Sequence, residues 1–93
     1  MNTGMDWENA VAGKSVMITG ASRGIGAATA RLFAQRGAKL GLAGRPSQAL
    51  ADLAEDIGAT VIPCDVADFG QVQAAVDSMT KTHGGLDVLI NNA

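Results

Sequence analysis

The sequence contains a single cysteine, Cys64, and a single histidine, His83. One cysteine excludes an internal disulfide and any multi-cysteine zinc site. Because Val61 and Ile62 precede Cys64, we interpret it as a small residue at the end of a strand rather than a nucleophile. His83 lies beside glycines with no other potential metal ligand next to it, which is typical of a solvated cation at a helix end. The sequence therefore predicts no metal site.

Clustered charge and long hydrophobic runs are also missing. The 7 Lys and Arg residues are scattered and are outnumbered by 9 Asp and Glu residues, so the formal charge is -2, and we expect no nucleic-acid partner. No segment approaches the ~18 consecutive apolar residues of a membrane span. Residues 1–13 lack the basic start and apolar stretch of a signal peptide, and we interpret them as a leader. Residues 14–93 are expected to form one domain of a cytoplasmic protein without membrane contact.

Short apolar runs alternate along the chain with segments of helical periodicity. We predict strands over residues 15–19, 39–43, 60–64 and 86–90. In the segments between them, apolar residues recur every three or four positions. A glycine ends each of these segments: Gly37, Gly58 and Gly84. Ser47 and Asp68 are expected to cap the second and third helices, with Gln71 completing a capping box. This β-α-β-α-β-α-β alternation predicts the α/β class, with a parallel sheet and right-handed crossovers.

The segment between the first strand and the first helix is rich in glycine. It reads Thr-Gly-Ala-Ser-Arg-Gly-Ile-Gly from Thr19 to Gly26, a G-x-x-x-G-x-G spacing. Gly20 permits a tight turn out of the strand, Gly24 lets the backbone approach a pyrophosphate, and Gly26 lets the helix pack closely on the sheet. The start of the helix adds free N–H groups and a partial positive charge. This context predicts a nucleotide-binding loop, and a P-loop is excluded because no lysine follows the glycines.

The end of the second strand indicates which dinucleotide the loop would hold. Folds that bind NAD place an acid there to accept a hydrogen bond from the ribose 2′-hydroxyl, whereas this sequence has Gly44 and Arg45. Arg45 and Arg23 could together bind a 2′-phosphate, because a guanidinium matches phosphate in a bidentate geometry. The alternative is that both are solvated surface arginines. We therefore predict NADP(H) as the coenzyme, with NAD(H) less favoured.

Three separated segments resemble motifs of the short-chain dehydrogenase/reductase family. Residues 19–26 are similar to the family's T-G-x-x-x-G-x-G loop. Cys64-Asp65-Val66 is similar to its adenine-side acid after the third strand, and Asn91-Asn92-Ala93 to its N-N-A-G segment after the fourth. The resemblance covers residues 13–93. It implies a Rossmann-type doubly wound parallel sheet, here truncated to four strands in the order 3-2-1-4.

The resemblance also implies a role for each motif residue. The pyrophosphate and ribose would be lined by Gly20, Ser22, Arg23 and Ile25, and Gly24 and Gly26 complete the cofactor-binding loop. Arg45 would meet the 2′-phosphate, Asp65 and Val66 would hold the adenine, and Asn92 would line the adenosine-side ribose. The chemistry agrees for Asp65, because a carboxylate at the carboxyl edge of a sheet can accept a hydrogen bond from the adenine amino group. The alternative is that Asp65 caps a helix or a turn.

The sequence has no counterpart to the family's catalytic residues. It contains no tyrosine, whereas the tyrosine of the family's Tyr-x-x-x-Lys motif is the general acid/base for hydride transfer. The resemblance implies a homo-oligomeric parent protein that is an NADP(H)-dependent oxidoreductase acting on a small carbonyl or alcohol substrate. This chain would be its coenzyme-binding part, without catalytic residues and inactive alone.

Two other functions are compatible with a glycine-rich loop in an α/β domain. One is a module that senses the dinucleotide without catalysis, which only sequence beyond residue 93 would distinguish from a reductase. The other is a methyltransferase-type fold that binds a nucleoside cofactor. It is disfavoured because such sites also prefer an acid where Gly44 and Arg45 stand.

Overall fold

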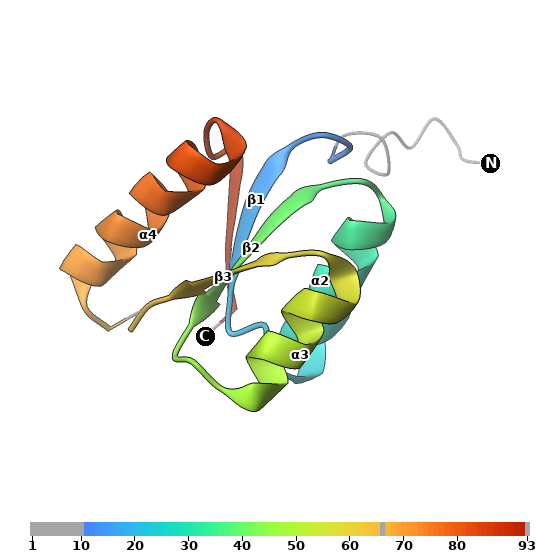
Figure 1. Cartoon of the computed structure of the whole chain (residues 1–93), viewed down its shortest axis with the longest axis horizontal. Coiled ribbons are helices and arrows are strands. Elements are labelled where there is room, and N and C mark those ends of the chain that lie inside the picture. The colour runs from blue at the N-terminus through green and yellow to red at the C-terminus, as the bar shows by residue number, and fades with distance from the viewer. Residues whose placement is uncertain (1–10, 66, 93) are drawn as a thin grey trace.

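The computed structural model describes residues 11–65 and 67–92, in which four strands alternate with three helices (Figure 1). In chain order the elements are β1 (Ser15–Thr19), α2 (Gly24–Gln35), β2 (Lys39–Gly44), α3 (Gln48–Ile57), β3 (Thr60–Pro63), α4 (Phe69–His83) and β4 (Val88–Asn91). The predicted alternation is confirmed, with small corrections at the strand ends. β2 runs one residue further than expected, β3 ends one residue earlier, and β4 begins two residues later and ends one residue later. The Gly84-Gly85 turn that precedes β4 has positive φ angles of 82° and 156°.

The four strands form one parallel sheet in the order β3-β2-β1-β4. Ile18 at the centre of β1 is in register with Leu42 of β2 on one side and with Ile90 of β4 on the other. The predicted order is therefore confirmed. The chain reverses its direction of travel across the sheet between β3 and β4, so the carboxyl ends of β1 and β4 form the switch point at which doubly wound sheets bind their ligands.

The helices cover both faces of the sheet, with α2 and α3 on one face and α4 on the other (Figure 1). Every residue of β1 is buried, and its side chains alternate between the two layers. Val16 and Ile18 pack against α2 and α3, whereas Met17 packs with Met79 of α4. A strand buried on both faces explains why its three central residues, 16–18, are all apolar without alternation.

A glycine lies in the middle of β2 because α4 crosses close above it. A Cβ added to Gly41 would overlap the Met79 sulfur and lie 2.8 Å from the Ile62 Cδ1 atom. Glycine normally weakens a strand. At this position it allows the methionine to fill the space between helix and sheet, so the loss of strand propensity is offset by packing.

The helix ends follow the predicted caps, with one difference at α4. The Ser47 hydroxyl accepts a hydrogen bond from the Leu50 N–H at 3.1 Å, and the Asp68 carboxylate accepts one from the Gln71 N–H at 3.2 Å. The sequence predicted that the Gln71 side chain completes a capping box at Asp68, and this prediction is wrong. The Gln71 Oε1 atom accepts a hydrogen bond from the Asp65 N–H at 2.7 Å instead. The first turn of α4 thus fixes the loop that follows β3.

No helix within the described ranges is long and apolar enough to cross a membrane.

The outer edge of β4 leads to a prediction about association. β4 is the last strand on its side of the described sheet, and its residue Leu89 is 48% exposed. An open strand edge beside an exposed apolar side chain favours pairing with another chain. We expect the 93-residue chain to self-associate at micromolar concentration, and Leu89→Lys to shift it toward monomer in sedimentation velocity. Phe69→Ser is the control for loss of an exposed apolar side chain, because Phe69 is exposed but lies outside the sheet. This variant should associate as the wild-type chain does. A monomeric wild-type chain, or association lost only in the Phe69 variant, would contradict this expectation.

Candidate coenzyme-binding site

The glycine-rich loop leaves β1 in a conformation that requires glycine at two positions. Gly20 and Gly24 have φ angles of 64° and 62°, which side-chain-bearing residues adopt only at a cost. A Cβ at Gly24 would have no heavy atom within 4 Å, so this part of the loop faces open space. The backbone can therefore be approached closely by a ligand at Gly24.

Gly26 is required for a different reason, which is contact rather than backbone angle. It is buried in the first turn of α2, where a Cβ would overlap the Gly20 carbonyl oxygen and lie 2.6 Å from the Asn92 Nδ2 atom. The helix start, the loop and the end of β4 therefore touch one another at this point. Close packing here directs the start of α2 toward the carboxyl edge of the sheet.

The start of α2 differs from the starts of the other two helices. Its N-cap residue, Arg23, makes no side-chain capping hydrogen bond. In α3 and α4 the side chains of Ser47 and Asp68 cap the first turn. The leading N–H groups of α2 lack such a cap, and together with the partial positive charge of the helix end they form a suitable anion site.

A hollow of about 500 Å³ lies beside this loop, at the carboxyl ends of β1, β2 and β3. It brings together four of the residues that the sequence singled out: Gly20, Ser22, Arg45 and Asp65. Its floor includes the buried residues Ala43, Leu50 and Cys64. An apolar floor with charged groups at its edge suits a planar base that carries polar substituents.

The remaining predicted residues lie outside this hollow. Arg23 and Ile25 are exposed at the start of α2, with Ile25 79% exposed. Asn92 is exposed just after the end of β4. Arg45 lines the hollow, whereas Arg23 is not among its lining residues. Val66 lies outside the described residues.

Thr19 is a residue of this region to which sequence reasoning assigned no role beyond its place in the motif. It is buried at the end of β1, where its hydroxyl donates to the Asn91 Oδ1 atom at 2.9 Å and accepts from the Asn92 N–H at 3.0 Å. These bonds fasten the end of β1 to the end of β4. A polar residue that ends an otherwise apolar strand was the available signal, because a buried hydroxyl needs partners.

The charges at the hollow come from Arg45 and Asp65, whose side chains form an ion pair with Nη2 and Oδ2 3.7 Å apart. The Arg45 side chain is 83% exposed and that of Asp65 37% exposed. An ion pair this exposed contributes little to stability. Its importance lies in placing a cation and an anion at the end of β2 and β3, over the same hollow.

Cys64, which precedes Asp65, is one of the buried residues that line the same hollow. Burial, followed by the nearby carboxylates of Asp65 and Asp68, raises the pKa of the Cys64 thiol above its usual value. The thiol therefore stays protonated and poorly nucleophilic near neutral pH. This agrees with the interpretation of Cys64 as a packing residue at a strand end.

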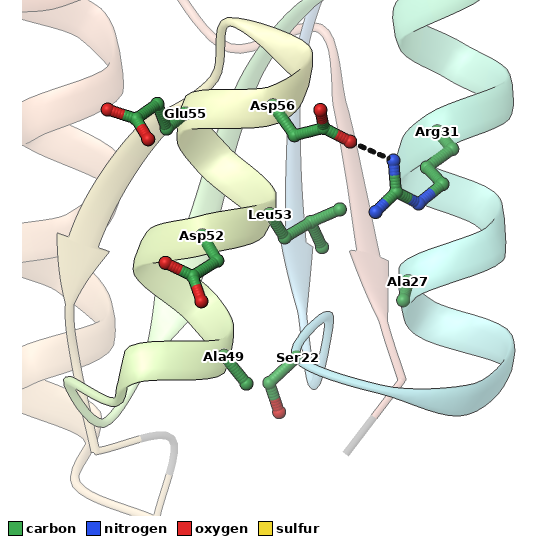
Figure 2. A pocket seen from close by; sticks show the side chains of 8 residues that line it. All are labelled: Ser22, Ala27, Arg31, Ala49, Asp52, Leu53, Glu55 and Asp56. Carbon is green, nitrogen blue, oxygen red and sulfur yellow. Dashed lines mark hydrogen bonds and ion pairs between the residues drawn. The ribbon is translucent and has the colours of Figure 1, made fainter.

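A second hollow, of about 580 Å³, lies between α2 and α3 (Figure 2). Its walls carry Asp52, Glu55 and Asp56, and Arg31 forms an ion pair with Asp56 across it. Three acids against one arginine repel a pyrophosphate. The charge of this groove makes it unsuitable for a dinucleotide, and the hollow at Arg45 is the candidate site.

The chain belongs to the short-chain dehydrogenase family, whose model matches residues 14–93. It is 41% identical over 81 residues to a mitochondrial borneol dehydrogenase from Lavandula x intermedia, and 45% identical over 86 residues to the oxidoreductase UcpA from Salmonella typhimurium. Each alignment covers 87% of this chain but only 31% and 32% of the relative. The chain thus spans about a third of the length of the curated relatives it matches.

A solved structure of a family member has the same fold as this chain. The short chain dehydrogenase from Burkholderia cenocepacia, determined in complex with NADP, matches with a TM-score of 0.84 and 38% identity over 91% of this chain and 37% of that chain. The truncated Rossmann-type fold is therefore confirmed. Family membership also favours an oxidoreductase over the methyltransferase-type alternative.

Proposed function

We propose that this chain is the NADP(H)-binding part of a parent oxidoreductase that interconverts a small-molecule carbonyl and alcohol. The observation that carries the proposal is Arg45, which lines the hollow at the end of β2 where a fold specific for NAD would place an acid. The Burkholderia relative in complex with NADP supports the same coenzyme.

The residues present fit such a coenzyme in three places. The pyrophosphate fits against the start of α2, where Gly24 leaves the backbone open and no side chain caps the first turn. The adenosine fits the hollow, where Asp65 can accept a hydrogen bond from the adenine amino group. Arg45 then meets the 2′-phosphate, and Ser22 lines the same hollow. We propose that Arg23 and Ile25 contact the part of the coenzyme that lies over the helix start, and that Asn92 contacts ribose.

The bound nicotinamide would supply or accept hydride, and the role of these residues is to bind and orient it. The chain contains no tyrosine, so we propose that the general acid/base belongs to another part of the parent and that this chain alone turns over no substrate. We also propose that the parent is a homo-oligomer.

The coenzyme assignment is tested by comparing dissociation constants. We expect NADP(H) to bind more tightly than NAD(H), and Arg45→Ala to weaken NADP(H) binding about tenfold with little effect on NAD(H). A charge-assisted bond is worth ~1.5–3 kcal/mol, and we take the lower end because the Arg45 side chain is 83% exposed. Isothermal titration calorimetry at low and high salt is the measurement, since screening should reduce the difference.

Arg31→Ala is the matched control, because Arg31 is also an exposed arginine but pairs with Asp56 in the acidic groove. It should leave both dissociation constants unchanged. Equal affinity for the two coenzymes in the wild type, or an equal effect of both arginine variants, would show that Arg45 is an ordinary surface charge.

A further inference from the structure

Asp65 has a contact that its expected role toward adenine does not explain. Among the described residues that line the hollow, Arg45 and Asp65 are the two that carry a charge, and they face each other at 3.7 Å. A 2′-phosphate that reaches Arg45 therefore enters a place where the guanidinium already has an anionic partner.

The Asp65 side chain is held in place by hydrogen bonds, whereas the Arg45 side chain is free to move in solvent. The Asp65 Oδ1 atom accepts a hydrogen bond from the Ala67 N–H at 3.0 Å, and its own N–H donates to the Gln71 side chain at 2.7 Å. The N–H of Cys64, the preceding residue, donates to the Gly44 carbonyl at 2.9 Å, which fastens the end of β3 to the end of β2. Arg45 has an 83% exposed side chain that can reorient in solvent. The carboxylate is thus fixed, and the guanidinium can exchange one anion for another.

We propose that Asp65 determines how strongly the site discriminates for a 2′-phosphate, by competing with the phosphate for the Arg45 guanidinium. This inference rests on the proposed function. A doubly charged phosphate at Arg45 must displace the carboxylate from the guanidinium or share the guanidinium with it. A ligand with a 2′-hydroxyl pays neither cost. Asp65 therefore lowers the preference for the phosphorylated ligand below the level that Arg45 alone would give.

The test uses two nucleotides that differ only at the 2′ position, adenosine 2′,5′-bisphosphate and adenosine 5′-monophosphate, titrated calorimetrically into the 93-residue chain. The ratio of their dissociation constants measures the discrimination. Asp65→Asn is the informative variant, because the amide oxygen can still accept from the Ala67 N–H and from an adenine amino group. Any change in adenine binding affects both nucleotides and cancels in the ratio.

We expect Asp65→Asn to raise the discrimination ratio about three- to fivefold at low salt, which is the upper range for exposed charge pairs, and the gain to shrink at high salt. In an Arg45→Gln background the same substitution should leave the ratio nearly unchanged. Asp77→Asn is the control for net charge, since Asp77 is exposed on α4 and bonds to Gln73; it should have no effect in either background.

Three outcomes would overturn the proposal. A lower ratio in Asp65→Asn would mean that the acid helps Arg45 to bind phosphate. An unchanged ratio would mean that the pair has no influence. An equal rise with and without Arg45 would mean that Asp65 acts on the phosphate independently of the guanidinium. The proposed function fails in a distinguishable way, because the wild-type chain would then bind neither nucleotide or show no preference for the bisphosphate.

Discussion

Replacing Gly26 with alanine is expected to abolish nucleotide binding and to destabilise the chain by about 3 kcal/mol or more, the upper range for inserting a methyl group into a packed site. The added Cβ would overlap the Gly20 carbonyl oxygen and lie 2.6 Å from the Asn92 Nδ2 atom. Asn92 can move its side chain, but Gly20 presents backbone. Relief therefore requires a shift of the loop or of the start of α2, and both form the proposed pyrophosphate site. Urea unfolding followed by circular dichroism, with calorimetric titration of NADP(H), measures the two effects.

Gly24→Ala is the matched control within the same loop. Gly24 has a φ of 62°, but an added Cβ would meet no heavy atom within 4 Å. Its expected cost is the backbone strain alone, about 1–2 kcal/mol. If Gly24→Ala were as damaging to stability as Gly26→Ala, backbone strain rather than close contact would explain the loop's glycines. A stable Gly26→Ala variant with normal nucleotide affinity would refute the contact argument itself.

The order and type of the elements could be predicted from the sequence because each depends on local pattern. Apolar runs such as residues 16–18 require burial on both faces, and the helix stripes end at glycines that adopt positive φ angles, for example 72° at Gly58. The role of Gly41 could not be predicted in this way. In sequence it weakens a strand, and only the packing of Met79 from the opposite layer shows why a side chain is excluded there. Contacts between layers leave no periodic signal along the chain.

In the candidate site, too, the features that depend on local pattern could be predicted and the contacts between strands could not. The loop glycines and the position of Arg45 follow from the order of strand, turn and helix. The pairing of Arg45 with Asp65, which are twenty positions apart, depends on the register of β2 with β3, in which Gly44 lies opposite Pro63. The sequence assigned these two residues to different ends of the adenosine and did not predict their contact. Arg23, which was expected to bind the 2′-phosphate together with Arg45, is exposed at the start of α2 and does not line the hollow, so its role toward the phosphate stays a prediction.

Gly44, the last residue of β2, is the position at which a substitution is expected to change coenzyme choice most. Gly44→Asp should reverse the preference, weakening NADP(H) binding about ten- to a hundredfold and strengthening NAD(H) binding. The loss corresponds to replacing a charge-assisted contact of ~1.5–3 kcal/mol by repulsion. The substitution is sterically permitted, because a Cβ at Gly44 would be 3.6 Å from the Leu50 Cδ2 atom, an ordinary contact, and Gly44 has no positive φ. The new carboxylate would stand at the end of β2, where it can accept a hydrogen bond from a 2′-hydroxyl.

Gly44→Ala separates the charge of the new side chain from its size. It adds the same Cβ without a carboxylate, so it should leave the ratio of NADP(H) to NAD(H) dissociation constants close to that of the wild type. The Gly44→Asp effect should also diminish at high salt, since repulsion between a carboxylate and a phosphate at an exposed site is screened. If the aspartate variant keeps the wild-type preference, the end of β2 does not contact the 2′ position and the coenzyme assignment is wrong. If alanine shifts the ratio as much as aspartate, the site discriminates by shape, and the electrostatic roles proposed for Arg45 and Asp65 fail with it.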